Sequence, residues 1–418
     1  MTSCADSNWG ADDHRLLTLD EAWSLITAEA RPLQPEKVSF EQAAGRVLAS
    51  PVLASDDYPA FDKAMMDGFA VRASDCREPG ASLHVLGLVA AGRVAQQSIG
   101  PSQTIQVNTG APVPGGADAV VRVEDTTMSA DGKRVTINVA VGPGKHIAPQ
   151  GSDRKKHDLV LPPPMTLQAA QLAAAATAGA SELEVYPEVT VAVATTGDEL
   201  VPVGQSRKPG QIYESNSPML AALMREFGAS PYEIGRVRDE PTALKKALSE
   251  ALHYPVVITV GGMSMGTHDL VPQAFVELGI TWKFHGVLVR PGKPVAYGRG
   301  PDGQHVFGLP GNPVSAFVCA WLFVRMTVRA LQGHPALPPT RLRATLTKTL
   351  MPARDPRPAF VPARVWNNEK AGLVAEPCAW GGSGDPFGLA LANALMVRET
   401  PIGAVAGSPI DVILLSMP

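Results

Sequence analysis

The middle of the chain alternates between apolar runs and stretches of helical periodicity. Strands are predicted over residues 189–194, 255–260 and 305–309, where nearly continuous apolar side chains are typical of strands buried on both faces of a sheet. Helices are predicted over residues 216–227, 241–253, 269–278 and 313–331. Strands separated by helices of this length indicate a parallel sheet with right-handed crossovers, so this part belongs to the α/β class.

The N-terminal part follows a different pattern. Residues 18–21 form a capping box before an apolar-periodic run to Ala30, and residues 39–42 form a second one before a shorter helix that ends at Gly45. Short β-prone runs broken by Gly and Pro then fill residues 51–145 and predict a β-rich module. The strands expected there are residues 83–90, 104–108 and 119–123, and an alanine-rich helix over 167–180 follows.

After Gly333 the chain is punctuated by proline and predicts a small, separate β domain. Its expected strands are residues 341–347, 360–366, 395–397 and 410–415. The predicted domains are an N-terminal linker domain in two pieces (16–55 and 146–180), an inserted β-rich domain (56–145), the α/β domain (181–333) and the C-terminal domain (334–418).

Composition and charge exclude several classes of protein. The 418 residues are 45% hydrophobic and 18% charged, which predicts a folded chain of about three domains. There are 36 basic and 40 acidic residues, a net charge of −4, and no long basic run, which argues against nucleic-acid binding. The four cysteines are far apart and include no C-x-x-C pair, which argues against a zinc site or a disulfide framework.

Neither a signal peptide nor a membrane span is expected. The first 15 residues carry Asp6, Asp12 and Asp13 and lack an apolar core. The most apolar stretches, residues 167–180 and 314–324, are shorter than the roughly 20 residues that a membrane span needs. We therefore predict a cytoplasmic protein that does not bind a membrane.

Three loops at the predicted carboxyl ends of strands contain residues suited to ligand binding. They are residues 195–200 with Asp198 and Glu199, residues 261–266 with Asp269 close behind, and residues 308–315 at the start of the long helix. Glycine lets backbone N–H groups approach an anion, and a helix N-terminus attracts it. Carboxylates beside a phosphate need a cation between them, so the loops predict a phosphate site with Mg²⁺.

Each of these loops also has an ordinary structural explanation. Any α/β domain turns its strands with Gly, Asp and Ser, and Glu199 and Asp269 could be capping acids. Residues 59–70 and 108–118 are each explained by turn geometry when taken alone. Residues 289–294, with two cations on a tight turn, are either a solvated loop or an anion clamp. Three glycine-bearing loops at strand ends of one sheet favour a ligand site.

Seven sequence blocks in order, between residues 59 and 317, resemble the MoeA family of molybdopterin molybdenumtransferases, to which the E domain of gephyrin also belongs. The blocks are PAFDKAMMDGFAV, NTGAPVPGGADAVVRVED, TTGDELV, GQIYESNSPML, VVITVGGMSMGTHDLV, VRPGKPVAYG and GLPGNPVSAF. The resemblance implies a homodimer of multi-domain subunits, each with a parallel-sheet molybdopterin-binding α/β domain, an N-terminal helical and β-rich region and a small C-terminal β-barrel.

The resemblance also implies a reaction. The family inserts molybdate into adenylylated molybdopterin and releases AMP in a step that depends on Mg²⁺, forming molybdenum cofactor. The expected partners are adenylylated molybdopterin, molybdate, a second copy of the chain and the molybdopterin adenylyltransferase that supplies the substrate. Two alternatives remain open: a paralogue that binds molybdopterin as a scaffold with altered or no activity, and a molybdopterin adenylyltransferase.

The family's functional positions are carried over residue by residue. Catalytic roles are predicted for Asp67, Glu199 and Asp269. The predicted metal ligands are Asp153, Asp198, Glu199, Glu214 and Asp269. The predicted substrate-binding residues are Thr109, Gly110, Gly262, Ser264, Gly266, Arg290, Lys293, Pro310, Gly311, Asn312, Pro313 and Ser315.

The chain departs from the family pattern at several of these places. Arg290 takes the position of a family lysine, and Glu214 that of an aspartate. Ala148 and Gly286 align with an arginine and a lysine of the family, so two cations are missing. We therefore expect weaker molybdate binding than in relatives that keep both cations, unless Arg154, Lys155 or Lys156 compensates. Ala148→Arg and Gly286→Lys are the substitutions that would restore the two charges.

Overall fold

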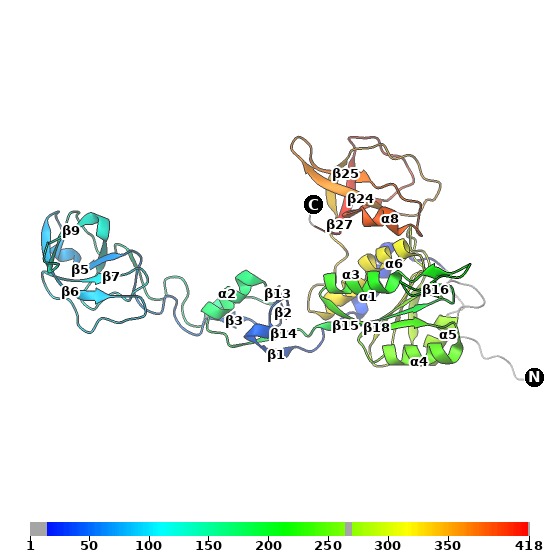
Figure 1. Ribbon diagram of the computed structural model, residues 1–418, viewed down its shortest axis with the longest axis horizontal. Coiled ribbons are helices and arrows are strands. Elements are labelled where there is room, and N and C mark those ends of the chain that lie inside the picture. The colour runs from blue at the N-terminus through cyan, green and yellow to red at the C-terminus, as the bar shows by residue number, and fades with distance from the viewer. Residues whose placement is uncertain (1–14, 264–269, 417–418) are drawn as a thin grey trace, which may run out of the picture. The chain divides into compact units, whose positions relative to one another are not determined.

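The computed structural model describes residues 15–263 and 270–416. They form two compact units, one made of residues 37–185 and the other of residues up to 36 together with 186–418 (Figure 1). The second unit contains the α/β part and the C-terminal barrel.

The α/β part is built on a six-stranded sheet in the order β18-β15-β19-β22-β21-β20. Four strands are parallel: β18 (Ala229–Val237), β15 (Val189–Thr196), β19 (Val256–Val260) and β22 (His305–Leu309). The other two, β21 (Ala296–Arg299) and β20 (Thr281–His285), add an antiparallel edge. The α/β prediction is confirmed, but the sheet is mixed, and β18 was not predicted because polar residues interrupt its apolar pattern.

Successive side chains of β15 point to opposite faces of the sheet and show which helices cover each face. Val191 and Val193 of β15 pack in the cluster that contains α1 (Leu19–Glu29), α3 (Asn216–Glu226) and the long helix that begins at Pro313. Ala192 and Ala194 face the opposite cluster, with α4 (Pro241–Ala251) and α5 (Leu270–Glu277). Figure 1 shows α1, α3 and α6 on one side of the sheet and α4 and α5 on the other. A strand buried on both faces is apolar throughout, as its sequence indicated.

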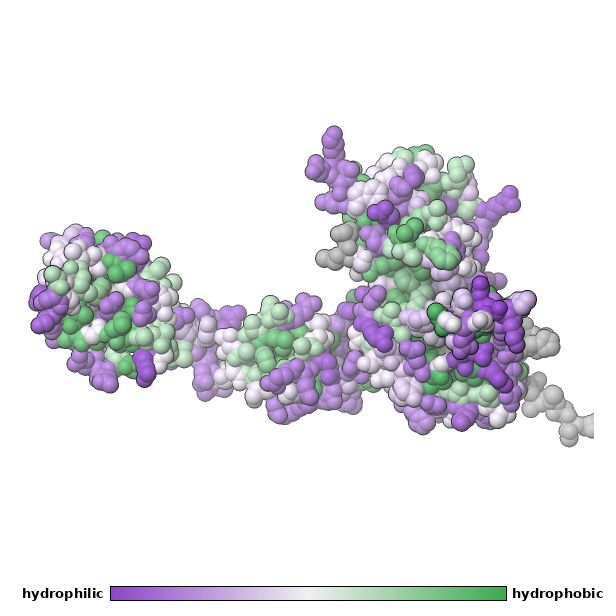
Figure 2. All heavy atoms as spheres, in the orientation of Figure 1, coloured by the Kyte–Doolittle hydropathy of each residue, from purple (hydrophilic) through white to green (hydrophobic). Residues whose placement is uncertain are grey.

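The long helix runs from Pro313 to Leu331 as α6 (Pro313–Cys319), a π-helical segment η4 (Ala320–Val324) and α7 (Arg325–Leu331). Its 19 residues are long and apolar enough to cross a membrane by length and composition, but 83% of the window is buried inside the protein. On the face drawn in Figure 2, hydrophobic residues are scattered among hydrophilic ones in both units. The helix is apolar because it lies in the core of the α/β part.

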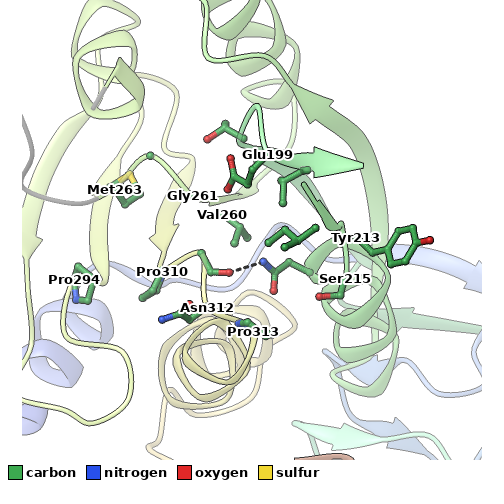
Figure 3. A pocket seen from close by; sticks show the side chains of 16 residues that line it. Glu199, Tyr213, Ser215, Val260, Gly261, Met263, Pro294, Pro310, Asn312 and Pro313 are labelled. Atoms are coloured by element: carbon green, nitrogen blue, oxygen red, sulfur yellow. Dashed lines mark hydrogen bonds between the residues drawn. The ribbon is translucent and has the colours of Figure 1, made fainter. Parts of the chain in front are cut away.

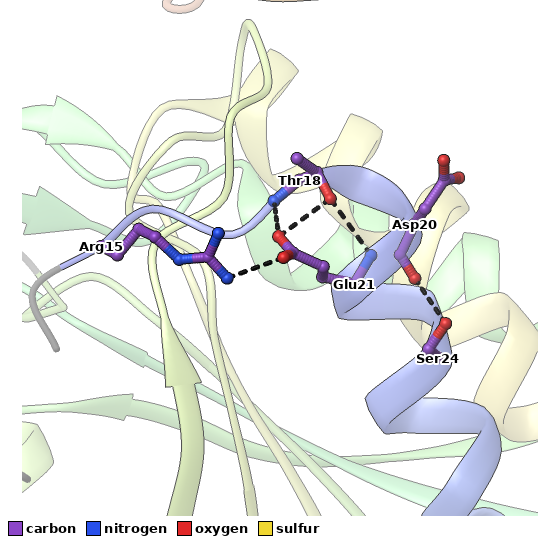
Figure 4. Close-up of polar contacts among 5 residues, drawn as sticks. All are labelled: Arg15, Thr18, Asp20, Glu21 and Ser24. Atoms are coloured by element: carbon purple, nitrogen blue, oxygen red, sulfur yellow. Dashed lines mark hydrogen bonds and ion pairs between the residues drawn. The ribbon is translucent and has the colours of Figure 1, made fainter.

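Helix α1 packs with this core although it is far from it in the sequence. The Trp23 indole N–H donates to the Leu322 carbonyl oxygen at 2.9 Å. The predicted capping box is present: Thr18 Oγ1 accepts from Glu21 N at 3.3 Å, and Glu21 Oε2 accepts from Thr18 N at 2.8 Å (Figure 4). Arg15 adds an ion pair to the Glu21 carboxylate at 2.7 Å. The Thr18 amide and the Arg15 guanidinium lower the pKa of Glu21 to about 2.

The stability that this cap contributes is expected to depend on pH. The pKa of Glu21 is lower in the folded state than in the unfolded state. The Glu21 carboxylate therefore stabilises the fold at neutral pH, and this stabilisation is lost as the pH falls from about 4.5 towards about 2. We expect Glu21→Gln to lower the thermal unfolding midpoint at pH 7 by about 1 °C, and the difference to vanish near pH 2. Asp20→Asn, which removes a charge from the same turn and leaves the cap intact, is the control. A difference that persists at pH 2 would contradict the prediction.

The unit of residues 37–185 contains a six-stranded sheet in the order β8-β5-β7-β6-β10-β9. Its strands are β5 (Gly68–Val71), β6 (Ala81–Val89), β7 (Gln103–Val107), β8 (Ala119–Arg122), β9 (Thr126–Met128) and β10 (Arg134–Ile137). Smaller sheets pair β1 (Glu36–Ser39), β14 (Glu182–Val185), β2 (Val47–Leu48) and β13 (Met165–Thr166), then β11 (Ile147–Ala148) with β4 (Lys63–Ala64), and β12 (Leu159–Leu161) with β3 (Val52–Leu53).

One α-helix and three 3₁₀ turns, η1 (Phe40–Gln42), η2 (Ala73–Asp75) and η3 (Val123–Asp125), complete the described part of this unit. Helix α2 (Ala169–Thr177) is followed by Gly179 in a positive-φ conformation, as its sequence indicated. The second predicted capping box was wrong: residues Phe40–Gln42 form one 3₁₀ turn, and the Ser39 side chain makes no capping hydrogen bond. The segment is too short to bury an apolar face, so helix propagation does not offset the cost of nucleation.

The C-terminal part closes into a barrel in the order β23-β25-β24-β26-β27, which confirms the predicted small β-barrel. The strands are β23 (Leu342–Leu346), β24 (Ala359–Asn368), β25 (Gly372–Pro377), β26 (Ala394–Arg398) and β27 (Pro409–Leu414). Strand β25 and the short helix α8 (Pro386–Ala390), capped by Asp385, were not predicted.

Candidate active site

A cavity of about 420 Å³ lies at the carboxyl ends of β15, β19 and β22 (Figure 3). Loops that follow these three strands supply Glu199, the pair Gly261 and Gly262, and residues 310–313. Tyr213, at the end of the short strand β17 (Ile212–Tyr213), and Asn216, the first residue of α3, also line it. Parallel strands bring their carboxyl ends to one edge of the sheet, so loops far apart in sequence meet there.

The two glycines are required by this arrangement. Gly261 (φ +91°) and Gly262 (φ +61°) both have a left-handed backbone. A Cβ atom on Gly261 would lie 2.5 Å from the Thr196 carbonyl oxygen, and one on Gly262 would lie 2.7 Å from Val271 Cγ2. Only glycine lets the chain turn here and keeps the cavity wall made of backbone.

Glu214 fixes the start of α3. Its Oε1 accepts hydrogen bonds from Asn216 N at 2.8 Å and Ser217 N at 2.9 Å. The helix begins at Asn216 as predicted, but the side chain of its N-cap residue, Ser215, makes no capping hydrogen bond. One oxygen of the Glu214 carboxylate is therefore engaged in capping, which limits what it can offer a metal ion.

One acidic residue lines this cavity, and two further acids that do not line it lie nearby. Glu199 lines it, and Asp198 precedes Glu199 in the same loop. Asp239 follows β18, whose neighbour in the sheet is β15. Partial desolvation of its carboxyl group, together with the charge of Asp198 and, more weakly, of Glu199, raises the pKa of Asp239. The three acids therefore share one negative field.

These acids by themselves form only part of a site for Mg²⁺. Within residues 15–263 and 270–416, no three His, Cys, Asp or Glu side chains are placed to hold a metal ion together. Mg²⁺ is commonly held by one or two carboxylates together with substrate phosphates, not by an all-protein cage. Glu199 with one of its neighbours, Asp198 or Asp239, fits such a partial site, which a phosphate would complete.

A second cavity, of about 700 Å³, adjoins the first, since Pro294, Pro310 and Asn312 line both. Its wall carries the cations Arg290, Lys293 and Arg357. The Arg357 charge is matched by Asp355 through a bidentate pair. Arg290 and Lys293 form no ion pair with a carboxylate in the described part of the chain. Their charges remain available to an anion.

The barrel holds the cationic loop in place. Arg290 N donates to the Pro358 carbonyl oxygen at 2.9 Å, and Phe360 N donates to the Arg290 carbonyl oxygen at 2.8 Å. On the other side, Asn312 Nδ2 donates to Ser383 Oγ at 2.9 Å. The second cavity is thus formed jointly by the α/β part and the barrel.

Other predicted residues lie in the unit of residues 37–185. Asp67 Oδ1 accepts from Thr109 N at 2.6 Å, so these two are brought together, and the Thr109 amide lowers the pKa of Asp67. Gly110 (φ +84°) turns the chain directly after Thr109. Asp153 is exposed, and its backbone N–H donates to the Tyr58 carbonyl oxygen at 3.0 Å.

The remaining predicted residues line one of the two cavities or lie outside the described residues. Gly262, Pro310, Gly311, Asn312 and Pro313 line the first cavity, and Arg290, Lys293 and Ser315 line the second. Ser264, Gly266 and Asp269 lie outside the described residues.

The sequence analysis missed Asp239, Asn216, Arg357 and Ser383. Asp239 stands two residues before Pro241, at which a helix was expected to begin, but the strand before it was not predicted, so nothing placed this acid at a strand end. Asn216 was predicted only as the first residue of a helix. Arg357 and Ser383 belong to the barrel, and no local pattern connects them with a loop of the α/β part.

The two positions that lack family cations differ in what they tolerate. Gly286 has φ +99°, and a Cβ atom there would lie 2.6 Å from Leu16 Cδ2. Gly286→Lys, suggested by sequence, is therefore a poor substitution. Ala148 is half-buried in β11, and its partner across the antiparallel pair is Lys63.

Comparison with known proteins assigns three segments of the chain to family models. Residues 192–330 match the family model described as "Probable molybdopterin binding domain". The sheet with its cavity is thus an α/β domain of the molybdopterin-binding class. Residues 17–179 match the "MoeA N-terminal region (domain I and II)", and residues 343–415 match the "MoeA C-terminal region (domain IV)".

Full-length relatives agree with these matches. The chain is 33% identical to the molybdopterin molybdenumtransferase of Staphylococcus epidermidis over 95% of both chains, and 34% identical to that of Nostoc sp. over 92% of this chain and 89% of the relative. The crystal structure of a molybdopterin biosynthesis MoeA protein from Pyrococcus horikosii superposes with a TM-score of 0.81 at 30% identity, covering 96% of this chain and all of that one. The chain belongs to the MoeA family of molybdopterin molybdenumtransferases, a family of transferases, as the sequence blocks predicted.

Proposed function

We propose that the protein inserts molybdenum from molybdate into adenylylated molybdopterin and releases AMP, with Mg²⁺ as cofactor. The single observation that carries this is the pair of adjoining cavities, one bordered by carboxylates and glycine loops and the other by unpaired cations. A substrate with a phosphoanhydride and an incoming oxyanion needs these two environments side by side.

Each cavity takes one part of the reaction in this proposal. Gly261 and Gly262 let the backbone approach the phosphates, and Glu199 with Asp198 or Asp239 would hold Mg²⁺ against them. The metal ion would neutralise charge on the phosphates when bound. Arg290 and Lys293 attract molybdate to the second cavity, and Asn312 lies at the border of the two.

The test is direct. Purified protein mixed with adenylylated molybdopterin, molybdate and MgCl₂ is expected to release AMP and to form a cofactor that reconstitutes an apo-molybdoenzyme. Binding of the substrate without AMP release would favour the scaffold alternative. Conversion of molybdopterin and ATP into the adenylylated form would favour the adenylyltransferase, although the matches outside the α/β domain speak against it.

The setting of this activity is also proposed. We infer a cytoplasmic homodimer that receives its substrate from a molybdopterin adenylyltransferase. Light scattering on the purified chain would test the dimer, and a monomeric mass would contradict it.

A further inference from the structure

The Asn216 carboxamide forms a hydrogen bond through its nitrogen, whereas its oxygen has no hydrogen-bond partner in the described part of the chain. The residue lines the first cavity and is only 6% exposed. Its Nδ2 donates to the Gly311 carbonyl oxygen at 2.8 Å, the contact drawn as a dashed line in Figure 3. Its Oδ1 is buried and has no hydrogen-bond partner among residues 15–263 and 270–416. If the amide were flipped, Asn216 Oδ1 would face the Gly311 carbonyl oxygen, and both atoms are acceptors. The contact with Gly311 therefore decides that Oδ1 is the unpaired atom.

The backbone at this position is fixed as well. Glu214 accepts the Asn216 N–H at 2.8 Å, and the side chain spans from α3 to the loop after β22, 95 residues further along the chain. The unpaired oxygen is therefore preorganised and not free to turn towards solvent. A buried acceptor without a partner costs about 1–3 kcal/mol, and native proteins rarely leave one unexplained.

The chemistry of the missing partner follows from the atom. An amide oxygen only accepts hydrogen bonds, so it repels phosphate and molybdate oxygens and requires a donor. Unlike Arg290 and Lys293 in the adjoining cavity, it cannot hold an oxyanion. This wall of the first cavity is suited to a neutral, planar group that carries N–H.

We propose that Asn216 is a specificity-determining residue that accepts a hydrogen bond from an aromatic amino group of the bound substrate. The inference rests on the proposed function, since adenylylated molybdopterin carries two such groups, one on adenine and one on the pterin. A keto group in the same place would set two acceptors against each other and be rejected.

Two pairs of probes differ in this amino group and distinguish its source. AMP is compared with inosine 5′-monophosphate, and pterin with lumazine, by calorimetric titration of the full chain. In the wild type we expect the keto member of one pair to bind about tenfold more weakly than the amino member, or worse. The pair that shows the difference identifies the base that Asn216 contacts.

Two variants connect the discrimination to this residue. Asn216→Leu removes the acceptor, and the affinity ratio within the responding pair is expected to fall to about one. Asn216→Asp keeps an acceptor while losing the donor to Gly311, so it should bind both members less well and still prefer the amino member. Circular dichroism checks the fold, and the wild-type comparison stands even if a variant does not fold.

Equal affinities within both pairs in the wild type, or no measurable binding of either pair, overturn the proposal. So does a preference that survives in Asn216→Leu. The turnover assay separates this failure from failure of the proposed function. AMP release from adenylylated molybdopterin without discrimination between probes leaves the function standing and removes only the role of Asn216.

Discussion

Glutamine in place of Glu199 is expected to reduce Mg²⁺-dependent AMP release about a hundredfold or more while leaving the fold intact. Glu199 lines the first cavity, and it shares a negative field with Asp198 and Asp239. Losing one carboxylate from a hard-cation site removes several kcal/mol of charge stabilisation, and about 1.4 kcal/mol corresponds to a factor of ten. Asp239→Asn should act in the same direction, because it removes charge from the same group.

Mg²⁺ titration separates a metal-binding role from a structural one. Glu199→Gln and Asp239→Asn should shift the Mg²⁺ concentration for half-maximal activity upwards. Glu214→Gln is the matched control, because its Oε1 caps α3. We expect it to lower the unfolding midpoint and leave the Mg²⁺ requirement near that of the wild type. Wild-type rates in both Glu199→Gln and Asp239→Asn would show that the proposed metal site is wrong.

The second large effect is expected when Arg290 and Lys293 are replaced, the two cations of the second cavity that have no carboxylate partner among the described residues. We expect Arg290→Ala and Lys293→Ala each to raise the molybdate concentration for half-maximal turnover about tenfold, and the double variant about a hundredfold. Both side chains line the cavity without a carboxylate partner in the described part of the chain. Because Lys293 is exposed, its effect should weaken at high salt, whereas that of half-buried Arg290 should persist.

Arg357 provides the control for these cations. It lines the same cavity, but Asp355 neutralises it, so Arg357→Gln together with Asp355→Asn keeps the local charge balance. This double variant is expected to change the molybdate requirement far less than Arg290→Ala. If Arg290→Ala and Lys293→Ala both bind molybdate like the wild type, the oxyanion enters elsewhere.

Much of the fold could be predicted because its determinants are local. The apolar run of β15 identifies a strand covered on both sides, and the capping box at Thr18 identifies the start of α1. Where the local signal was ambiguous, prediction failed: polar positions hid β18, and a capping pattern without an apolar face gave only one 3₁₀ turn at Phe40–Gln42.

The candidate site was predictable only in part. Glycine loops after strands pointed to Gly262, Gly311 and Glu199, and the structure brings these three to one cavity. Asp239 was missed because its strand was missed. Glu214 was assigned to metal binding by analogy of position, and its capping contacts became visible only in the structure.

The sequence by itself determined the class of the fold, the order of its elements and the family, since hydrophobic period, turn residues and ordered motifs are properties of neighbouring positions. Tertiary structure alone decided the contacts between distant segments. It set Asn216 against Gly311, Lys63 opposite Ala148 and the Arg290 loop against the barrel. These contacts depend on strand order, register and the packing of separate loops at one edge of a sheet, and no local pattern encodes them.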